Sequence, residues 1–142
     1  QRLSQSLSEG AAQVRQVPRG VTVEINAGIL FDPAEARLNP AAQRALRSMA
    51  EVLRGYRGHT IQVLGHTDSI DIRSALYPSN WELSAARACT VVRLFVEAGL
   101  DEKLLLAIGR AATQPIASNE TAEGRLRNRR VEIQILAPGG RP

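Results

Sequence analysis

Apolar residues recur along the chain with the two periods that distinguish strands from helices. Five segments show the alternation or the short apolar run that is typical of strands: residues 13–17, 21–25, 60–64, 104–108 and 131–135. The first two flank Pro18-Arg19-Gly20, a typical turn sequence, so we expect them to form a β-hairpin. The sequence therefore predicts a hairpin followed by three further strands.

One helix is predicted after the hairpin. Asn39 is a good N-cap and precedes Pro40, which suits the first helical position, and Gly55 or Gly58 ends the helix. Its apolar stripe has helical spacing: Leu46, Met49, Ala50 and Leu53.

A second long helix is predicted from residue 80 to Gly99, because Ser79 and Glu82 have the spacing of a capping box. The stripe that we expect to be buried consists of Ser84, Ala88, Val91, Val92 and Phe95. Near the start of the chain, Leu3 and Leu7 stand four apart and favour a short helix.

From residue 21 onward the predicted elements follow the order β, α, β, α, β, β. Two helices of roughly 15 residues and about four strands predict an α+β fold, a two-layer sandwich with both helices on one face of a mixed sheet. An N-terminal hairpin and linker segment precede it. We expect residues 1–20 to be a linker, 21–137 the domain and 138–142 a tail, with the other face of the sheet left for solvent or a partner.

Composition narrows the choice of partner. The 142 residues are 44% hydrophobic, enough for one domain, and the net charge of +4 attracts anionic polymers or lipids. Aromatic residues make up only 4% and the arginines are scattered, so we expect no nucleic-acid partner. Cys89 is the single cysteine and lies in the second predicted helix, which excludes an internal disulfide. No segment has the roughly 18 consecutive apolar residues of a membrane helix.

Polar residues that could bind a ligand cluster in two places, residues 65–68 after a strand and residues 80–88 at a helix start. Asp68 and Arg87 belong to these clusters. They could form a simple ion pair. They could also bind the two ends of a zwitterion, with Asp68 taking the ammonium and the planar fork of Arg87 taking the carboxylate.

Three ordered motifs resemble those of a known family: Gly65-His66-Thr67-Asp68, Asn80-x-x-Leu83-Ser84-x-x-Arg87-Ala88-x-x-Val91 and Asn128-Arg129-Arg130-Val131-Glu132. With Leu30-Phe31-Asp32 before the first long helix, they make residues 21–136 similar to the OmpA-like peptidoglycan-binding domain. The resemblance implies binding of the diaminopimelate residue in the stem peptide of the wall, with Asp68 and Arg87 as the main clamps.

The resemblance also implies further site residues. Thr67, Asn80 and Leu83 would shape the pocket, and Asn128 with Arg129 or Arg130 would contact peptide carboxylates. The sequence does not choose between the two arginines.

The long loop of residues 69–79 sharpens the resemblance, because with Trp81-Glu82-Leu83-Ser84 it is similar to flagellar stator B subunits of the MotB, MotD and PomB kind. Residues 114–116 and 119–125 fit the same pattern. This resemblance implies the periplasmic domain of a bacterial inner-membrane protein. It further implies a homodimer that meets a stator A subunit through a membrane segment outside this sequence. The alternative is a wall-anchoring domain of an outer-membrane protein or lipoprotein.

We expect no enzyme, although Ser84, His66 and Asp68 are the residue types of a hydrolase triad. A nucleophilic serine needs a strained turn and an oxyanion pocket, whereas Ser84 falls on the inward stripe of a predicted helix. No cofactor or metal site is expected either, since neither histidine has two further ligands nearby. We expect Trp81 to pack the long loop against the second helix.

Overall fold

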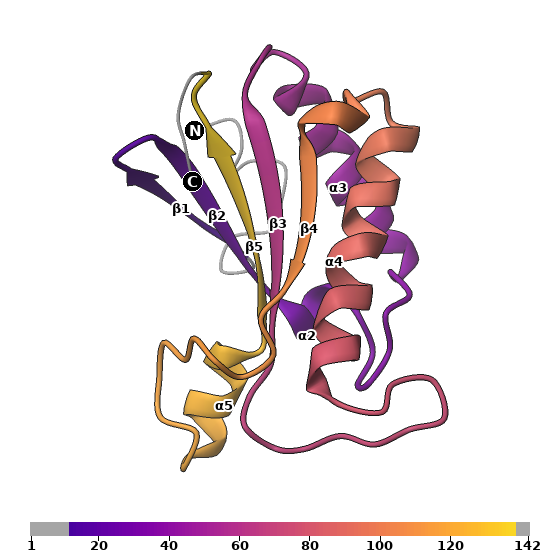
Figure 1. The fold of residues 1–142 in the computed structure, drawn as a ribbon, viewed down its shortest axis with the longest axis vertical. Coiled ribbons are helices and arrows are strands. Elements are labelled where there is room, and N and C mark those ends of the chain that lie inside the picture. The colour runs from indigo at the N-terminus through magenta and orange to yellow at the C-terminus, as the bar shows by residue number, and fades with distance from the viewer. Residues whose placement is uncertain (1–11, 139–142) are drawn as a thin grey trace.

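A five-stranded mixed sheet organises the computed structural model, which describes residues 12–138. The strands are β1 (Ala12–Val17), β2 (Gly20–Asn26), β3 (Thr60–His66), β4 (Leu105–Gly109) and β5 (Arg130–Leu136). Their order in space is β1-β2-β5-β3-β4 (Figure 1). β3 and β4 are parallel, and the other neighbouring strands are antiparallel. The predicted α+β sandwich and its strands are confirmed.

The helices are α2 (Ala27–Leu30), α3 (Pro40–Leu53), α4 (Asn80–Glu97), the 3-10 helix η1 (Glu102–Leu104) and α5 (Ala122–Asn128). α3 and α4 start where the sequence predicts, because Asn39 and Ser79 accept hydrogen bonds from backbone amides of the first turn. The three shorter helices were not predicted, since three to seven residues are too few to show a helical period. The short helix predicted within residues 1–10 lies outside the described residues.

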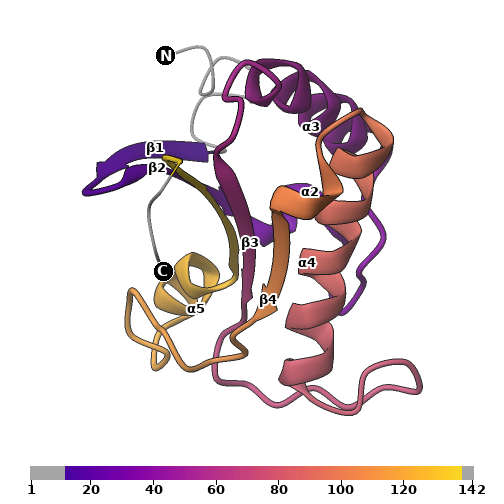
Figure 2. The same ribbon diagram turned by 45° about the horizontal axis from the view of Figure 1, so that its top comes forward.

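The core lies between the sheet and the helix pair. Figure 2 shows α3 and α4 on the same side of the sheet, with α5 set apart where β5 begins. The core side chains are fully buried and come from both layers: Val23, Ile25, Leu46, Met49, Val63, Val91, Phe95 and Ile133. Val92, which we expected in the buried stripe of α4, is only half-buried.

Two glycines bring α4 unusually close to the sheet. Gly65 in β3 pairs with Gly109 in β4. A Cβ atom would lie 2.3 Å from the carbonyl oxygen of Ser84 at the first position and 2.7 Å from the amide nitrogen of Ala85 at the second. Only glycine permits this approach. The first turns of α4 therefore pack directly on the ends of β3 and β4.

β1 extends the sheet beyond the domain start expected at residue 21. It pairs with β2 along its whole length, from Ala12 to Val17. The sheet thus begins within the range that we expected to be linker. For the residues before Ala12, the linker remains a prediction.

The face of the sheet opposite α3 and α4 carries a cluster of charged side chains near the start of β5. Arg130 Nε lies 3.3 Å from Glu132 Oε2 and 3.6 Å from Glu24 Oε2. His66 Nε2 lies 3.3 Å from Glu132 Oε1 and is 2% exposed. His66, and to a smaller extent Arg130, hold the pKa of Glu132 below its ordinary value despite partial burial.

Candidate functional site

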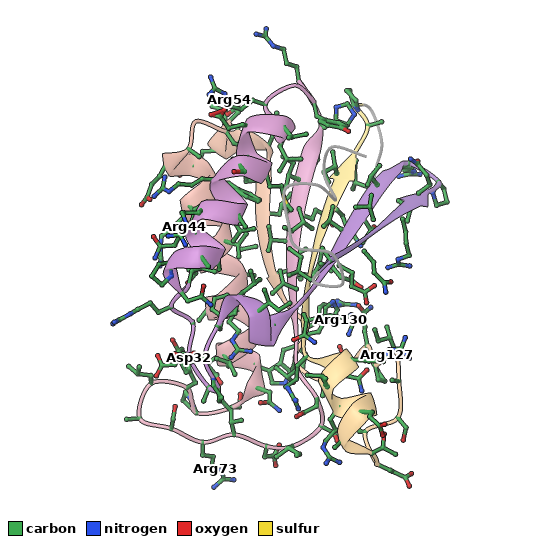
Figure 3. The ribbon with its side chains drawn as sticks, turned by 180° about the vertical axis from the view of Figure 1, so that it is seen from behind. Asp32, Arg44, Arg54, Arg73, Arg127 and Arg130 are labelled. Atoms are coloured by element: carbon green, nitrogen blue, oxygen red, sulfur yellow. The ribbon has the colours of Figure 1, made fainter. Side chains whose placement is uncertain are left out.

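Segments from four parts of the chain enclose a pocket of about 510 Å³ at the end of the sheet where β3 ends and β5 begins. We call it the clamp pocket. Its lining includes Phe31, Asp32, Thr67, Asp68, Ile70, Ile72, Asn80, Leu83, Arg87, Leu126 and Arg129. Figure 3 shows Asp32, one of the lining residues, in the lower half of the molecule, with Arg54 at the opposite end. Six of the eight predicted site residues thus share one pocket.

Asp68 is the acidic group of the pocket and is only 6% exposed. Its Oδ1 accepts a hydrogen bond of 3.0 Å from the amide of Ile70, and its Oδ2 lies 2.6 Å from Arg129 Nη1. These two contacts fix the direction of the carboxylate. Its charge is matched in this structure by an arginine of the same chain.

Arg87 is the basic group, and its side chain is fixed by three contacts. Nε donates to the carbonyl of Glu35 at 2.7 Å, Nη2 donates to that of Asp32 at 3.2 Å, and the guanidinium lies 4.9 Å from the Phe31 ring centroid. Burial lowers the pKa of Arg87 to about 10, opposed by the nearby Tyr77, so the group stays charged at neutral pH. A guanidinium has five N–H donors, and the other three have no partner among the described residues.

A chain of hydrogen bonds fixes the Asp68 loop to α4. The amide of Thr67 donates to the carbonyl of Ala111 at 2.9 Å, and the amide of Ala111 donates to Ser84 Oγ at 3.1 Å. Thr67 Oγ1 donates to the carbonyl of Asp68 at 2.8 Å. Ala111 adopts a left-handed conformation (φ 51°), which is unusual for alanine and is held by these bonds. Thr67 and Ser84 therefore set the position of the acid relative to the helix that carries the base.

Asn80 and Leu83 lie on the first turn of α4 and form one wall of the pocket. Asn80 Nδ2 donates to the carbonyl of Ile70 at 3.0 Å and to that of Asp68 at 3.4 Å, which holds the start of the long loop. Its Oδ1 is buried and has no hydrogen-bond partner among the described residues. Leu83 is 4% exposed and supplies apolar surface. Both residues line the clamp pocket, where we expected them to lie.

The structure separates the two arginines between which the sequence could not choose. The side chain of Arg129 is 41% exposed and lines the clamp pocket. That of Arg130 points to the other face of the sheet and is 4% exposed. There it pairs with Glu24 and Glu132 and donates to two backbone carbonyls. Arg130 is not in the clamp pocket, and we leave it out of the proposed ligand contacts.

Asn128 is also outside the clamp pocket, contrary to the expectation that it contacts the same ligand as Asp68. It is fully buried at the end of α5. Its Oδ1 accepts from the amides of Ile116 and Ala117, and its Nδ2 donates to the carbonyl of Ala117 and to Asn119 Oδ1. Asn128 therefore organises the loop before α5.

Sequence reasoning missed the apolar lining that α5 and the long loop supply. Ile70 and Ile72 line the pocket from the loop, and Leu126 lines it from α5. The signal for α5 was Thr121, whose Oγ1 accepts from the amide of Gly124 at 2.9 Å and caps the helix. No period in the sequence shows that this short helix faces the pocket.

The remaining expectations concern Ser84, a metal site, a membrane-spanning helix and Trp81. Ser84 is 1% exposed, and its Oγ donates to the carbonyl of Trp81, so it packs inside the fold as expected. Within residues 12–138 no group of three or more His, Cys, Asp or Glu side chains could bind a metal ion. None of the helices in that range is long and apolar enough to cross a membrane. The expectation for Trp81 was wrong, because its side chain is 54% exposed.

The fold and the pocket together define a small binding domain. The OmpA family matches residues 30–129, and the chain therefore belongs to the OmpA family. The predicted resemblance, including the likeness to MotB among its relatives, is confirmed.

Three known proteins illustrate the similarity. The cell wall anchor of the T6SS from Pseudomonas aeruginosa has a TM-score of 0.88 at 38% identity, covering 96% of this chain and 97% of that one. A putative MotB-like protein from Desulfovibrio vulgaris has a TM-score of 0.88 at 30% identity, covering 98% and 86%. Motility protein B of Bacillus subtilis is 34% identical over 92% of this chain and 51% of its own length. The chain spans about half the length of the curated relatives it matches.

Proposed function

We propose that this domain binds peptidoglycan without cutting it, by holding a diaminopimelate residue of the stem peptide in the clamp pocket. The observation that carries the proposal is that two buried, oppositely charged groups, Asp68 and Arg87, line one pocket with apolar walls. A free amino-acid end carries both an ammonium and a carboxylate on one carbon. Such a ligand matches both charges at once.

The proposed binding mode uses the carboxylate of Asp68 and the unpartnered N–H groups of Arg87. The ligand ammonium takes the place of Arg129 at Asp68, and the ligand carboxylate accepts from the N–H groups of Arg87 that have no protein partner. The displaced Arg129 then contacts a second carboxylate of the peptide. Thr67 and Asn80 hold the acidic loop, and Leu83 contacts the aliphatic part of the ligand.

The test is titration of the purified domain with isolated peptidoglycan and with free meso-diaminopimelate. Asp68→Ala and Arg87→Ala each leave one buried charge unmatched in the complex, so each should cost about 2–5 kcal/mol of binding. Arg44→Ala, an exposed arginine on α3, is the matched control (Figure 3). Wild-type protein that binds no peptidoglycan, or folded variants that bind like wild type, would contradict the proposal. Release of soluble wall fragments would contradict its non-catalytic part.

We further propose that the domain anchors a flagellar stator and lies in the periplasm as part of a longer inner-membrane protein. The long loop of residues 69–79 and the similarity to Motility protein B support this assignment. The stator proposal implies a homodimer and a stator A subunit as partner. Deletion of the gene should abolish swimming. A deletion strain that still swims would contradict the assignment.

A second candidate has its own supporting observation. The 38% identity to the T6SS cell wall anchor over nearly its whole length favours the wall anchor of a secretion system. Under this proposal the deletion strain swims normally but loses the activity of that secretion system. An outer-membrane protein or lipoprotein remains the third form of wall anchor. A β-barrel or a lipidated cysteine encoded in the same gene, in place of a single membrane helix, would support this form.

A further inference from the structure

A second hollow of about 330 Å³ lies beside the clamp pocket, further along α4. We call it the side groove. Its lining comes from residues 35–37, from residues 76–77 of the long loop, and from Ala86, Cys89, Thr90 and Arg93 of α4. None of these residues belongs to the predicted site. The side groove is therefore a feature that the proposed clamp does not use.

The same two chain segments line both hollows, so the side groove continues the clamp pocket. Residues 32–34 line the clamp pocket, and residues 35–37 line the side groove. In the long loop, Ile70 and Ile72 line the first, whereas residues 76–77 line the second. Arg87 stands at the boundary, since it lines the clamp pocket and donates to the carbonyl of Glu35.

The shared segment is fixed to α4, which gives the side groove a firm base. Thr90 Oγ1 donates to the carbonyl of Ala36 at 2.7 Å, one helical turn beyond the bond from Arg87 to Glu35. Ala36 is 8% exposed. A ligand can therefore lie across this segment without first having to order it.

The side groove combines positive charge with exposed apolar surface. Arg37 and Arg93 are exposed and form no ion pair within the described residues, and Glu35 is the only acidic residue in the lining. Leu76 is 73% exposed, and Tyr77 beside it is half-buried. These groups suit an anionic ligand that also carries apolar parts.

We propose that the side groove is a second subsite for the wall peptide, and that it takes an anionic residue of the same peptide whose zwitterionic residue occupies the clamp pocket. This inference rests on the proposed function. The spacing fits, because six helical residues place Arg93 about 9 Å beyond Arg87 along α4. An extended peptide covers that distance with about three residues at roughly 3.3 Å each.

Calorimetry with two probes separates the subsites. Free meso-diaminopimelate reaches only the clamp pocket, whereas a stem tetrapeptide that contains it reaches both. Arg37→Gln/Arg93→Gln should weaken binding of the tetrapeptide about tenfold and leave binding of diaminopimelate unchanged. Arg19→Gln/Arg44→Gln removes the same charge from exposed positions outside both hollows and should change neither.

The single cysteine gives a direct probe, because Cys89 is exposed and lies in the side groove. Bound tetrapeptide should slow alkylation of the Cys89 thiol, and bound diaminopimelate should not. A tetrapeptide with its other carboxylates amidated should bind wild type no better than diaminopimelate does.

The outcomes also distinguish this inference from the proposed function. If neither probe binds wild type, the proposed function fails, and the inference fails with it. If both bind but the double variant and the rate of Cys89 alkylation behave like the control, only the second subsite is wrong. Equal protection of Cys89 by both probes would also overturn the inference, because diaminopimelate alone is too short to reach the thiol.

Discussion

At the residue scale, the adjacent arginines Arg129 and Arg130 have opposite environments. The side chain of Arg129 is 41% exposed, and Asp68 keeps its hydrogen bond from the amide of Ile70, so Arg129→Gln should lower the free energy of unfolding by about 1 kcal/mol or less. Arg130 is buried between Glu24 and Glu132. Arg130→Gln removes the guanidinium that both carboxylates share and leaves Glu24 with Arg15 and Glu132 with His66, at a cost of about 3–5 kcal/mol. Urea denaturation of the two variants measures the difference.

Ligand binding should reverse this ranking. Arg129→Gln should weaken the binding of peptidoglycan, because the side chain lies in the clamp pocket and its proposed contact with a peptide carboxylate is lost. Folded Arg130→Gln should bind like wild type. Equal stability of the two variants would mean that the buried pairs around Arg130 contribute little.

Arg87 has a structural role in addition to its proposed ligand contact. Lysine keeps the charge but cannot reproduce two fixed bonds to the carbonyls of Asp32 and Glu35. Arg87→Lys should therefore speed amide hydrogen exchange in residues 34–37 and weaken the binding of diaminopimelate. Arg93→Lys, on the same helix, is the matched control and should leave exchange in that segment unchanged. Unaltered exchange in Arg87→Lys would show that other contacts hold the segment.

At the element scale, the position of α4 depends on the glycine pair beneath it. Gly65→Ala places a Cβ atom 2.3 Å from the carbonyl oxygen of Ser84, so α4 must move. We expect a loss of about 1–3 kcal/mol of stability and weaker binding of diaminopimelate, because α4 carries Asn80 and Arg87. Gly55→Ala is the control, since its Cβ meets nothing closer than 3.4 Å. Stability is measured by thermal unfolding and binding by calorimetry.

The predicted loss of diaminopimelate binding depends on the shift of α4. If Gly65→Ala loses stability but keeps the full affinity for diaminopimelate, the approach of α4 to the sheet does not set the clamp geometry.

At the scale of the whole molecule, the buried charges around β5 link stability to pH. Interaction with His66 and Arg130 lowers the folded-state pKa of Glu132 below its ordinary value of 4.5. The ionised carboxylate therefore stabilises the fold above pH 4.5, and this contribution is lost as the pH falls through the lowered folded-state value. Glu132→Gln should be less stable than wild type at neutral pH, and the difference should shrink below pH 4.5.

Chemical denaturation across that range measures this contribution. The neighbouring Glu24 also faces Arg130, so Glu24→Gln is the appropriate comparison. A stability difference between wild type and Glu132→Gln that stays constant down to the acid transition would show that Glu132 is not the group responsible.

Much of the fold follows from local signals. The strands and the two long helices appear in the sequence as periods of two and 3.6, because each of these elements buries one face against the core. Their starts appear as capping residues such as Asn39 and Ser79, because the first amides of a helix need acceptors. α2 and α5 gave no such period, and tertiary contacts such as those of Asn128 define their surroundings.

The sequence by itself determined the sandwich and its strands, and it predicted that Asp68 and Arg87 could bind the two ends of a zwitterion. Only the tertiary structure decided which of Arg129 and Arg130 reaches the pocket. Successive side chains point in opposite directions where the chain enters a strand, and the local sequence Arg-Arg does not show which direction faces the site. The tertiary structure likewise shows that Asn128 lies outside the pocket and that Ile72 and Leu126 line it. The sequence could not show this, because these positions depend on contacts between segments far apart in the chain.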